Sequence, residues 1–191
     1  GDGEVVSERS HQMNDRLPWR IFGLVNAHPH PLEPRTTAIR NKDGQPLPTA
    51  FDGTPAAAFL ISEKEMDRRR QSPQAVCPSC HGTSWVEGHW ARLEHTIRET
   101  NEKTVAATKI LQTIWEKGLA TGPGNGGSPF DEAVERVWSD IWLLYANTVR
   151  FASAMGGADY GVFADGRWAQ HRNLQEMLDY LGFLRAGKAG K

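Results

Sequence analysis

Apolar and polar residues follow a helical period through the second half of the chain. Beyond residue 85 the apolar positions recur every three to four residues, which is the spacing of one face of an α-helix. Gly118 and Gly122 follow this stretch, and glycine is typical of the position where a helix ends. The pattern predicts a long helix whose buried stripe consists of Leu93, Ile97, Thr104, Ile110, Leu111, Ile114 and Trp115.

A turn-forming segment at 121–128 separates this helix from a second one. Ser128 is a typical N-cap residue, Pro129 suits the first helical position, and Asp131 and Glu132 suit the first turn. We therefore expect a helix that begins after Ser128 and is stopped by the glycine pair at 156–157. Its apolar positions are Phe130, Val134, Val137, Trp138, Ile141, Trp142, Tyr145 and Val149.

A last helix is predicted over 168–184, after a loop at 158–167. The tail at 185–191 is small and basic, and we expect it to fray. The apolar positions of this helix are Leu174, Met177, Leu178, Leu181 and Phe183.

The first part of the chain carries a different signal, because residues 1–55 hold most of the prolines. Proline fixes φ and removes a backbone donor, so long helices and central strands are disfavoured there. We expect an extended, loop-rich segment with a short helix near 17–26, lying against another part of the protein or against a large prosthetic group. The pattern of apolar and polar residues at 56–71 predicts a short amphipathic helix.

Together these elements predict a mainly α fold, in which a loop-rich N-terminal segment precedes a bundle of long helices. The net charge of the 191-residue chain is −1, which gives no reason to expect nucleic acid or an anionic membrane as a partner. No apolar run is long enough to span a membrane, and no signal peptide is visible. The chain begins with Gly1 in polar sequence, which indicates a processed protein or a fragment.

Both cysteines of the chain lie in one motif, Cys77-Pro78-Ser79-Cys80-His81. This Cys-x-x-Cys-His spacing is typical of c-type haem attachment, in which two thiols form thioethers with the haem vinyl groups and the adjacent imidazole binds the iron. One pair of cysteines makes no disulfide framework, and a redox dithiol of the thioredoxin type needs a βαβ context that the pattern does not show.

A zinc site is the competing interpretation of the same cysteines. Cys77 and Cys80 with His89 and His95 would form a Cys₂His₂ set of ordinary spacing. The direct adjacency of His81 to Cys80 favours haem.

A haem with one histidine ligand has a second axial position, and several histidines are candidates for it. His89 opens the long helix close to the motif, while His11 and His28 lie in the segment expected to wrap around another group. Spacing does not choose among these three candidate distal ligands. His30, His95 and His171 fit ordinary surface or hydrogen-bonded histidines. Most of the seven tryptophans fit helix-packing positions, some facing the haem edge.

Three segments resemble the C-terminal part of the hydroxylamine oxidoreductase family. They are HQMNDRLPWRIFGLVNAHPHP, CPSCHGTSWVEGHW and SAMGGADYGVFADGRW, at 11–31, 77–90 and 153–168. The resemblance covers essentially the whole chain and includes long stretches outside the haem motif. The resemblance implies that the complete protein is an octahaem c-type cytochrome and a homotrimer. It also implies one catalytic haem per subunit and a mainly helical C-terminal region.

The resemblance also implies a role for Tyr160, which composition alone would assign to packing. In the oxidative members of the family a tyrosine of a neighbouring subunit is covalently bonded to the catalytic haem, and Tyr160 falls at that place. The implied activity is oxidation of hydroxylamine or hydrazine in the periplasm or an equivalent compartment, with electrons passed to a cytochrome-type acceptor. The catalytic haem's own motif is absent from this chain, which corresponds to the last of eight haems and is expected to be inactive alone.

On this interpretation the chain has three parts. Residues 1–76 form the haem-wrapping segment, residues 77–89 attach a haem, and residues 90–191 form the helical bundle with a tyrosine loop at 156–167. Two other functions remain open at this point. One is a self-contained monohaem electron carrier, in which Tyr160 is ordinary packing, and the other is a zinc-stabilised helical module.

Overall fold

The computed structural model of the chain describes residues 39–44, 49–52, 54–156 and 166–189. Within these residues the structure is mainly helical, and its only β-type pairing is an isolated bridge between Thr49 and Pro55. The predicted mainly α class is therefore confirmed. The helix predicted near 17–26 and most of the predicted loop at 158–167 lie outside the described residues. None of the described helices is both long enough and apolar enough to cross a membrane.

The first α-helix is displaced toward the C-terminus from its predicted place at 56–71. Residues Ala57–Phe59 form a single 3₁₀ turn, η2, and Leu60 after it is extended. Helix α1 then spans Glu63–Val76, and the hydroxyl of Ser62 accepts a hydrogen bond from the backbone N–H of Glu65 (3.3 Å). The serine satisfies an amide that would otherwise lack a partner in the first turn, so the α-helix begins after it.

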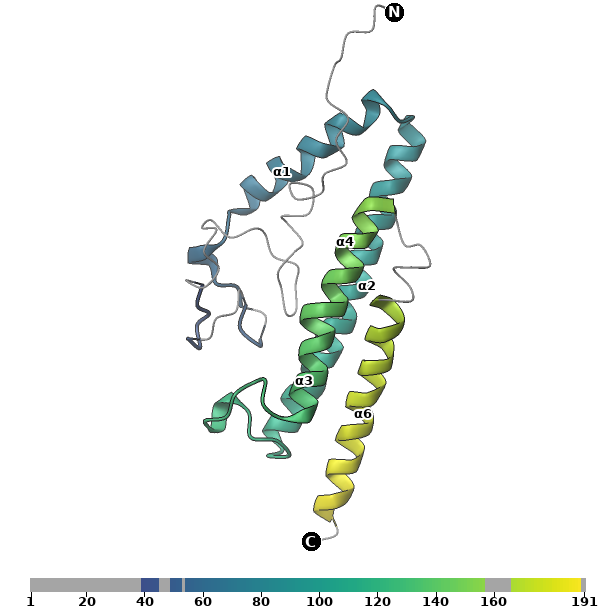
Figure 1. Ribbon diagram of the computed structural model, residues 1–191. Coiled ribbons are helices and arrows are strands. Elements are labelled where there is room, and N and C mark those ends of the chain that lie inside the picture. Colours follow the sequence, from purple (N-terminus) through teal and green to yellow (C-terminus); the bar gives the residue numbers. More distant parts are fainter. Residues whose placement is uncertain (1–38, 45–48, 53, 157–165, 190–191) are drawn as a thin grey trace, which may run out of the picture.

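The long helix predicted by the apolar stripe is α2, Thr83–Glu116, with 34 residues. All members of the predicted stripe are buried or half-buried, which confirms that interpretation. The helix ends where glycine predicted it, because Gly118 adopts a φ of +57°, a left-handed conformation that side chains with a Cβ rarely take. Figure 1 shows α1 and α2 meeting at a sharp corner, with α2 running the length of the bundle.

A ladder of threonines runs along the buried face of α2. Thr96, Thr100, Thr104 and Thr108 are each at most 2% exposed. The hydroxyls of the last three donate to the carbonyl four residues earlier, at 2.7, 2.9 and 2.8 Å. Each hydroxyl is thus satisfied inside its own helix, so these short side chains can line the contact with α4 and α6 without an unpaired polar group.

The second long helix begins four residues later than predicted, so the assignment of Ser128 as its cap is wrong. The Ser128 hydroxyl instead accepts a local hydrogen bond from the Phe130 N–H (3.2 Å). Helix α3 spans Ala133–Ser139 with Glu132 as N-cap, and Glu132 and Glu135 form a reciprocal capping box. The buried Glu135 carboxylate also accepts the indole N–H of Trp115 at 2.8 Å, so a contact with α2 fixes where α3 starts.

The helix continues through a π-helical segment into α4. This segment, η5, spans Asp140–Tyr145, and α4 spans Ala146–Gly156, so the predicted end at Gly156 is confirmed. The last helix, α6, spans Trp168–Ala189 and begins as predicted. It extends five residues beyond the predicted end, so the expected fraying from residue 185 is wrong as far as Ala189. Alanine, arginine and lysine favour a helix, and the single glycine of this stretch, Gly187, does not end it.

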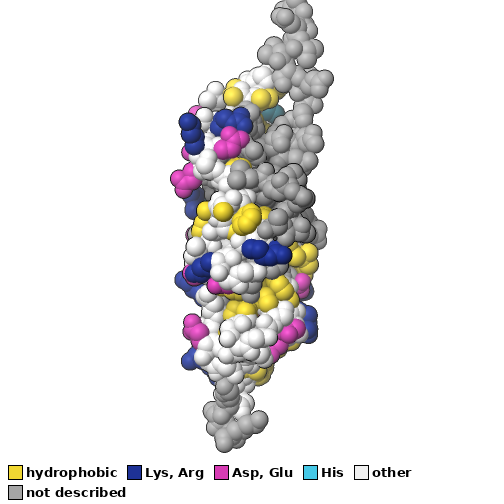
Figure 2. All heavy atoms as spheres, turned by 90° about the vertical axis from the view of Figure 1, so that its left-hand side faces the viewer, with side chains coloured by type: hydrophobic (Ala, Val, Ile, Leu, Met, Phe, Trp, Pro, Cys, Tyr) yellow, Lys and Arg dark blue, Asp and Glu magenta, His cyan; other side chains and the backbone are white. Residues whose placement is uncertain are grey.

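The hydrophobic core lies between α2, α3, η5 and α6. Its centre includes Leu111, Trp138, Ile141 and Met177, all of which are fully buried. Two predicted apolar positions of α6 lie outside it, because Leu178 is 46% exposed and Phe183 is 76% exposed. Figure 2 shows acidic and basic side chains interspersed over the visible face, without a large patch of one sign among the residues described.

Candidate functional site

The Cys-x-x-Cys-His motif forms the corner between α1 and α2 (Figure 1). Residues Cys77–Ser79 make a 3₁₀ turn, η3, and the carbonyl of Cys77 accepts hydrogen bonds from the N–H groups of Cys80 (3.2 Å) and His81 (3.0 Å). The Ser79 hydroxyl donates to the carbonyl of Val76 at 2.7 Å. These bonds fold the motif back on itself, so both thiols and the imidazole project from one tight turn.

The motif lies at an apolar surface. Cys77 is half-buried and Cys80 is exposed, and the two are not joined by a disulfide. Val76 before the motif is 44% exposed, and Trp85 after it is 46% exposed. Leaving large apolar side chains in water is unfavourable, and an apolar group seated on the turn would cover them.

Three aromatic rings are stacked at the start of α2. The rings of His81 and Trp85 lie 3.9 Å apart between centroids with an interplanar angle of 16°, and those of Trp85 and His89 lie 5.2 Å apart at 2°. Trp85 and His89 lie four residues apart on one face of α2, and His81 lies just before the first turn of that helix. His89 is buried and meets the edge of Trp90 at 5.5 Å. His81 and His89 therefore share one stack, with Trp85 between them.

The remaining sequence-predicted residues fall into two groups. His95 and His171 are exposed, as expected for surface histidines, and Nε2 of His95 lies 4.0 Å from Oε2 of Glu99. His11, His28 and Tyr160 lie outside the described residues, so their predicted roles stay predictions.

The zinc alternative is not assembled in the structure. His89 is buried while His95, six residues later, is on the exposed face of α2. Over the described ranges, no group of three or more histidine, cysteine or acidic side chains is placed to hold a metal ion. Cys77, Cys80, His89 and His95 therefore do not converge on one point.

The structure describes both ends of the predicted tyrosine loop. At one end α4 stops at Gly156. At the other, the Arg167 guanidinium donates to the Thr96 hydroxyl (2.9 Å) and pairs with Glu99 (3.2 Å), both on α2. Burial lowers the pKa of Lys103, one turn further along the same helix. Arg167 thus ties the start of α6 to α2 where the loop ends.

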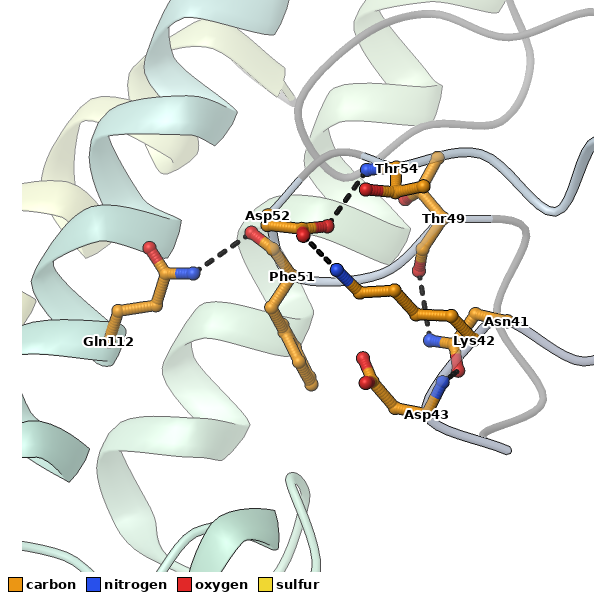
Figure 3. A network of polar contacts seen from close by, with 8 residues as sticks. All are labelled: Asn41, Lys42, Asp43, Thr49, Phe51, Asp52, Thr54 and Gln112. Carbon is orange, nitrogen blue, oxygen red and sulfur yellow. Dashed lines mark hydrogen bonds and ion pairs between the residues drawn. The ribbon is translucent and has the colours of Figure 1, made fainter.

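A second polar network lies far from the motif, near the other end of α2 (Figure 3). Lys42 pairs with Asp52, and this hydrogen bond holds the pKa of the Asp52 carboxyl well below its usual range. The amide of Gln112 donates to the carbonyl of Phe51 at 2.9 Å, which fastens this segment to α2. Phe51 then packs edge-on against Trp115, with ring centroids 5.0 Å apart.

An open cleft of about 470 Å³ adjoins this network, lined in part by Phe51, Gln112, Trp115 and Glu116. A helix of 34 residues is about 50 Å long, so the cleft and the motif lie near opposite ends of α2. The cleft is therefore separate from the candidate site.

The stack around Trp85 was not predicted, although its signal is present in the sequence. An aromatic residue four positions before His89 lies on the same face of a helix as that histidine, and it is also close in sequence to His81. The sequence predicted that most tryptophans are helix-packing residues and that some face the haem edge, without singling out Trp85.

Comparison with known proteins places the fold and the motif in context. A solved structure called "Hypothetical multiheme protein" matches 98% of the chain with a TM-score of 0.74 and 29% sequence identity. The chain spans 43% of the length of that protein. No family model matches the chain, and no curated protein matches it. The chain is thus a mainly α unit that is similar to part of a larger multihaem protein.

Proposed function

We propose that the chain carries one covalently bound c-type haem and serves electron transfer within a multihaem oxidoreductase. The observation that carries the proposal is the Cys77–His81 motif, folded into one turn at an apolar corner. The similarity to part of a solved multihaem protein supports it independently of the motif.

The residues of the corner fit a haem. Cys77 and Cys80 would hold it through thioethers, each formed by adding an S–H group across a vinyl double bond with no atom lost. His81 would give its imidazole nitrogen to the iron as the proximal ligand. Val76 and Trp85 would lose their exposure to water and keep water from the group. A bound haem supplies one-electron transfer at its iron.

The axial partner of that iron stays a proposal among three histidines. His11, His28 and His89 are the candidate distal ligands, for this haem or for others of the same protein. Of these three, His89 lies within the described residues.

We further propose that the complete protein oxidises hydroxylamine or hydrazine. The support is the resemblance of 11–31, 77–90 and 153–168 to the hydroxylamine oxidoreductase family. In this proposal the protein is a homotrimer of the periplasm or an equivalent compartment, and it delivers electrons to a cytochrome-type acceptor. Tyr160 is bonded to the catalytic haem of a neighbouring subunit. The haem at Cys77 and Cys80 is an electron-transfer station, and the chain alone is inactive.

Haem attachment is tested by maturing the chain in cells that contain a cytochrome c assembly system. The product should be red and give a pyridine haemochrome spectrum, and mass spectrometry should find a haem adduct on the peptide spanning 74–85. Replacing both Cys77 and Cys80 with alanine should remove the adduct. His95→Ala, at an exposed position, is the control and should keep it. A colourless chain with unmodified thiols would overturn the proposal.

The finer activity is tested in the complete protein with Tyr160→Phe. This change should abolish the tyrosine crosslink, alter the absorption of the catalytic haem and sharply lower oxidation of hydroxylamine or hydrazine. The haem on the 74–85 peptide should be unaffected. Tyr180→Phe, a half-buried tyrosine on α6, is the matched control. Full oxidative turnover in Tyr160→Phe would refute the catalytic role and leave the electron-transfer role standing.

A further inference from the structure

The orientation of the His81 ring is fixed by its neighbour. Trp85 lies parallel to it at 3.9 Å between centroids, and His89 lies parallel to Trp85 on the far side at 5.2 Å. Stacked aromatic rings attract through dispersion and electrostatics, by about 0.5–1.5 kcal/mol per pair beyond the area they bury. The imidazole of His81 therefore cannot turn about its long axis without losing this contact.

An imidazole binds a metal through a lone pair that lies in the plane of its ring. A stacking partner covers the face of the ring and leaves the nitrogen at the edge accessible. Trp85 can thus hold the His81 plane while the ligating nitrogen stays available, and it shields one side of the ligand from water.

The same geometry separates His89 from the iron that His81 would bind. Two histidines that ligate one iron from opposite sides point their nitrogens toward each other, with the metal between them. In the stack the ring faces, not the nitrogen edges, are directed along the line from His81 to His89, and Trp85 occupies the space between. His89 is buried behind Trp85 and closes the stack from the protein side.

We propose that Trp85 is a positioning residue for the haem ligand His81, and that His89 supports Trp85 and does not ligate the same iron. The inference rests on the proposed haem attachment at Cys77, Cys80 and His81. Trp85 sets the rotational angle of the proximal imidazole and excludes water beside it. Ligand orientation and solvent access are among the means by which a protein tunes a haem potential. His89 stays a candidate ligand for a different haem.

The stack itself is tested in the chain without haem by NMR. A proton above the face of an indole resonates upfield, so the ring protons of His81 should lie upfield of those of the exposed His95. Trp85→Leu should remove this difference. Trp168→Leu, which changes a 58% exposed tryptophan on α6, should leave it unchanged. Equal shifts of His81 in the unaltered chain and in Trp85→Leu would overturn the inference.

The consequence for the haem is tested in the matured chain. Trp85→Leu should keep the attached haem but lower its midpoint potential, because water beside the ligand favours the more highly charged ferric state. We expect about a tenfold change in the redox equilibrium constant, which is 59 mV for a one-electron couple. The electron paramagnetic resonance spectrum of the ferric haem should also change, since it depends on the ligand plane. Trp85→Phe, which keeps a flat ring, should restore most of both properties.

His89→Ala separates support from ligation. If His89 does not ligate this iron, the variant keeps the spin state of the haem and shifts the potential less than Trp85→Leu does. Conversion of the haem to the high-spin form in His89→Ala would overturn the inference. So would a haem-loaded Trp85→Leu protein that matches Trp168→Leu in potential and spectrum. Absence of haem from the unaltered chain would instead overturn the proposed function, and the inference with it.

Discussion

Gly166 lies in a π-helical turn just ahead of α6, where the chain passes close to α4, and Gly166→Ala tests that close approach. An ideal Cβ on Gly166 would lie 2.5 Å from Cγ2 of Val149 and 3.5 Å from its backbone nitrogen. Carbon atoms pack at about 3.5–4.0 Å, so the two methyl groups would have to separate by about 1 Å. Val149 is fully buried and has no room to turn into solvent.

Two terms of opposite sign determine the outcome. Overpacking a close-packed interior costs about 1–3 kcal/mol. Alanine is more favourable than glycine at a helical position by about 1 kcal/mol, which offsets part of this cost. We therefore expect Gly166→Ala to lower the free energy of unfolding by about 1 kcal/mol, although helix propensity alone predicts an increase.

The assay is urea unfolding followed by far-UV circular dichroism, with Gly182→Ala as the matched control. Gly182 lies on α6 with no heavy atom within 4 Å of an added Cβ, so this variant should be more stable than the unaltered chain by about 0.5–1 kcal/mol. Adding Val149→Ala to Gly166→Ala should relieve the clash, so the double variant should lose less than the sum of the two single losses. If Gly166→Ala stabilises the protein as Gly182→Ala does, the close approach of the chain to α4 is refuted.

Two further predictions concern polar groups of the bundle. Burial raises the pKa of Glu135 above its ordinary value of about 4.5, so the folded state binds a proton at this carboxyl more tightly than the unfolded state does. The stability that protonated Glu135 contributes is therefore lost as the pH rises from about 4.5 through the raised pKa. Unfolding titrations from pH 4 to 7 should show that Glu135→Gln flattens this decline, and an unchanged slope would contradict the prediction. The buried indole of Trp138 donates to the hydroxyl of Thr108 at 3.0 Å, so Trp138→Phe should lower the free energy of unfolding by about 1–3 kcal/mol through the lost bond and the unfilled space. The control Trp168→Phe, at an exposed position, should change it by less than about 0.5 kcal/mol, and equal losses would refute the role of the bond.

Sequence periodicity predicted the long helices because their stability comes from one continuous apolar face. The stripe on α2 from Leu93 to Trp115 is such a face, and Gly118 marks an end that backbone conformation explains. Signals of this kind lie within a few residues of the element that they describe, so one sequence is sufficient to find them.

The errors arose where a contact distant in sequence decides a local boundary. Ser128, Pro129 and Asp131 make a convincing helix start, but Glu135 gains a hydrogen bond from Trp115, twenty residues earlier, and the helix begins at Ala133. Phe183 is exposed because the buried stripe of α6 passes through Met177, Leu181 and Leu184, which leaves Phe183 on another face of the helix. The contact between Trp115 and Glu135 cannot be identified from the local pattern.

The candidate site was predicted in part. The residue types and spacing of Cys77, Cys80 and His81 predict haem attachment without any knowledge of the fold. The structure places the three residues on one turn. The position of Trp85 depends on α2 beginning at Thr83, which carries the indole over His81. Helix starts are the least regular part of a sequence pattern, so this relation became visible only in three dimensions.

The π-helical segment η5 gives the second long helix a change of phase. Its wider turns take up an extra residue compared with an α-helix, so every side chain after Tyr145 is rotated by about 100° from where an uninterrupted helix would place it. Deleting one residue from 140–145 should therefore convert the segment to a regular α-helix and leave Val149 and Ser153 on the buried side of α4. Inserting a residue there would shift the phase by a further ~100° and turn both side chains away from the core. Related sequences should accordingly tolerate the loss of one residue in this segment better than the gain of one.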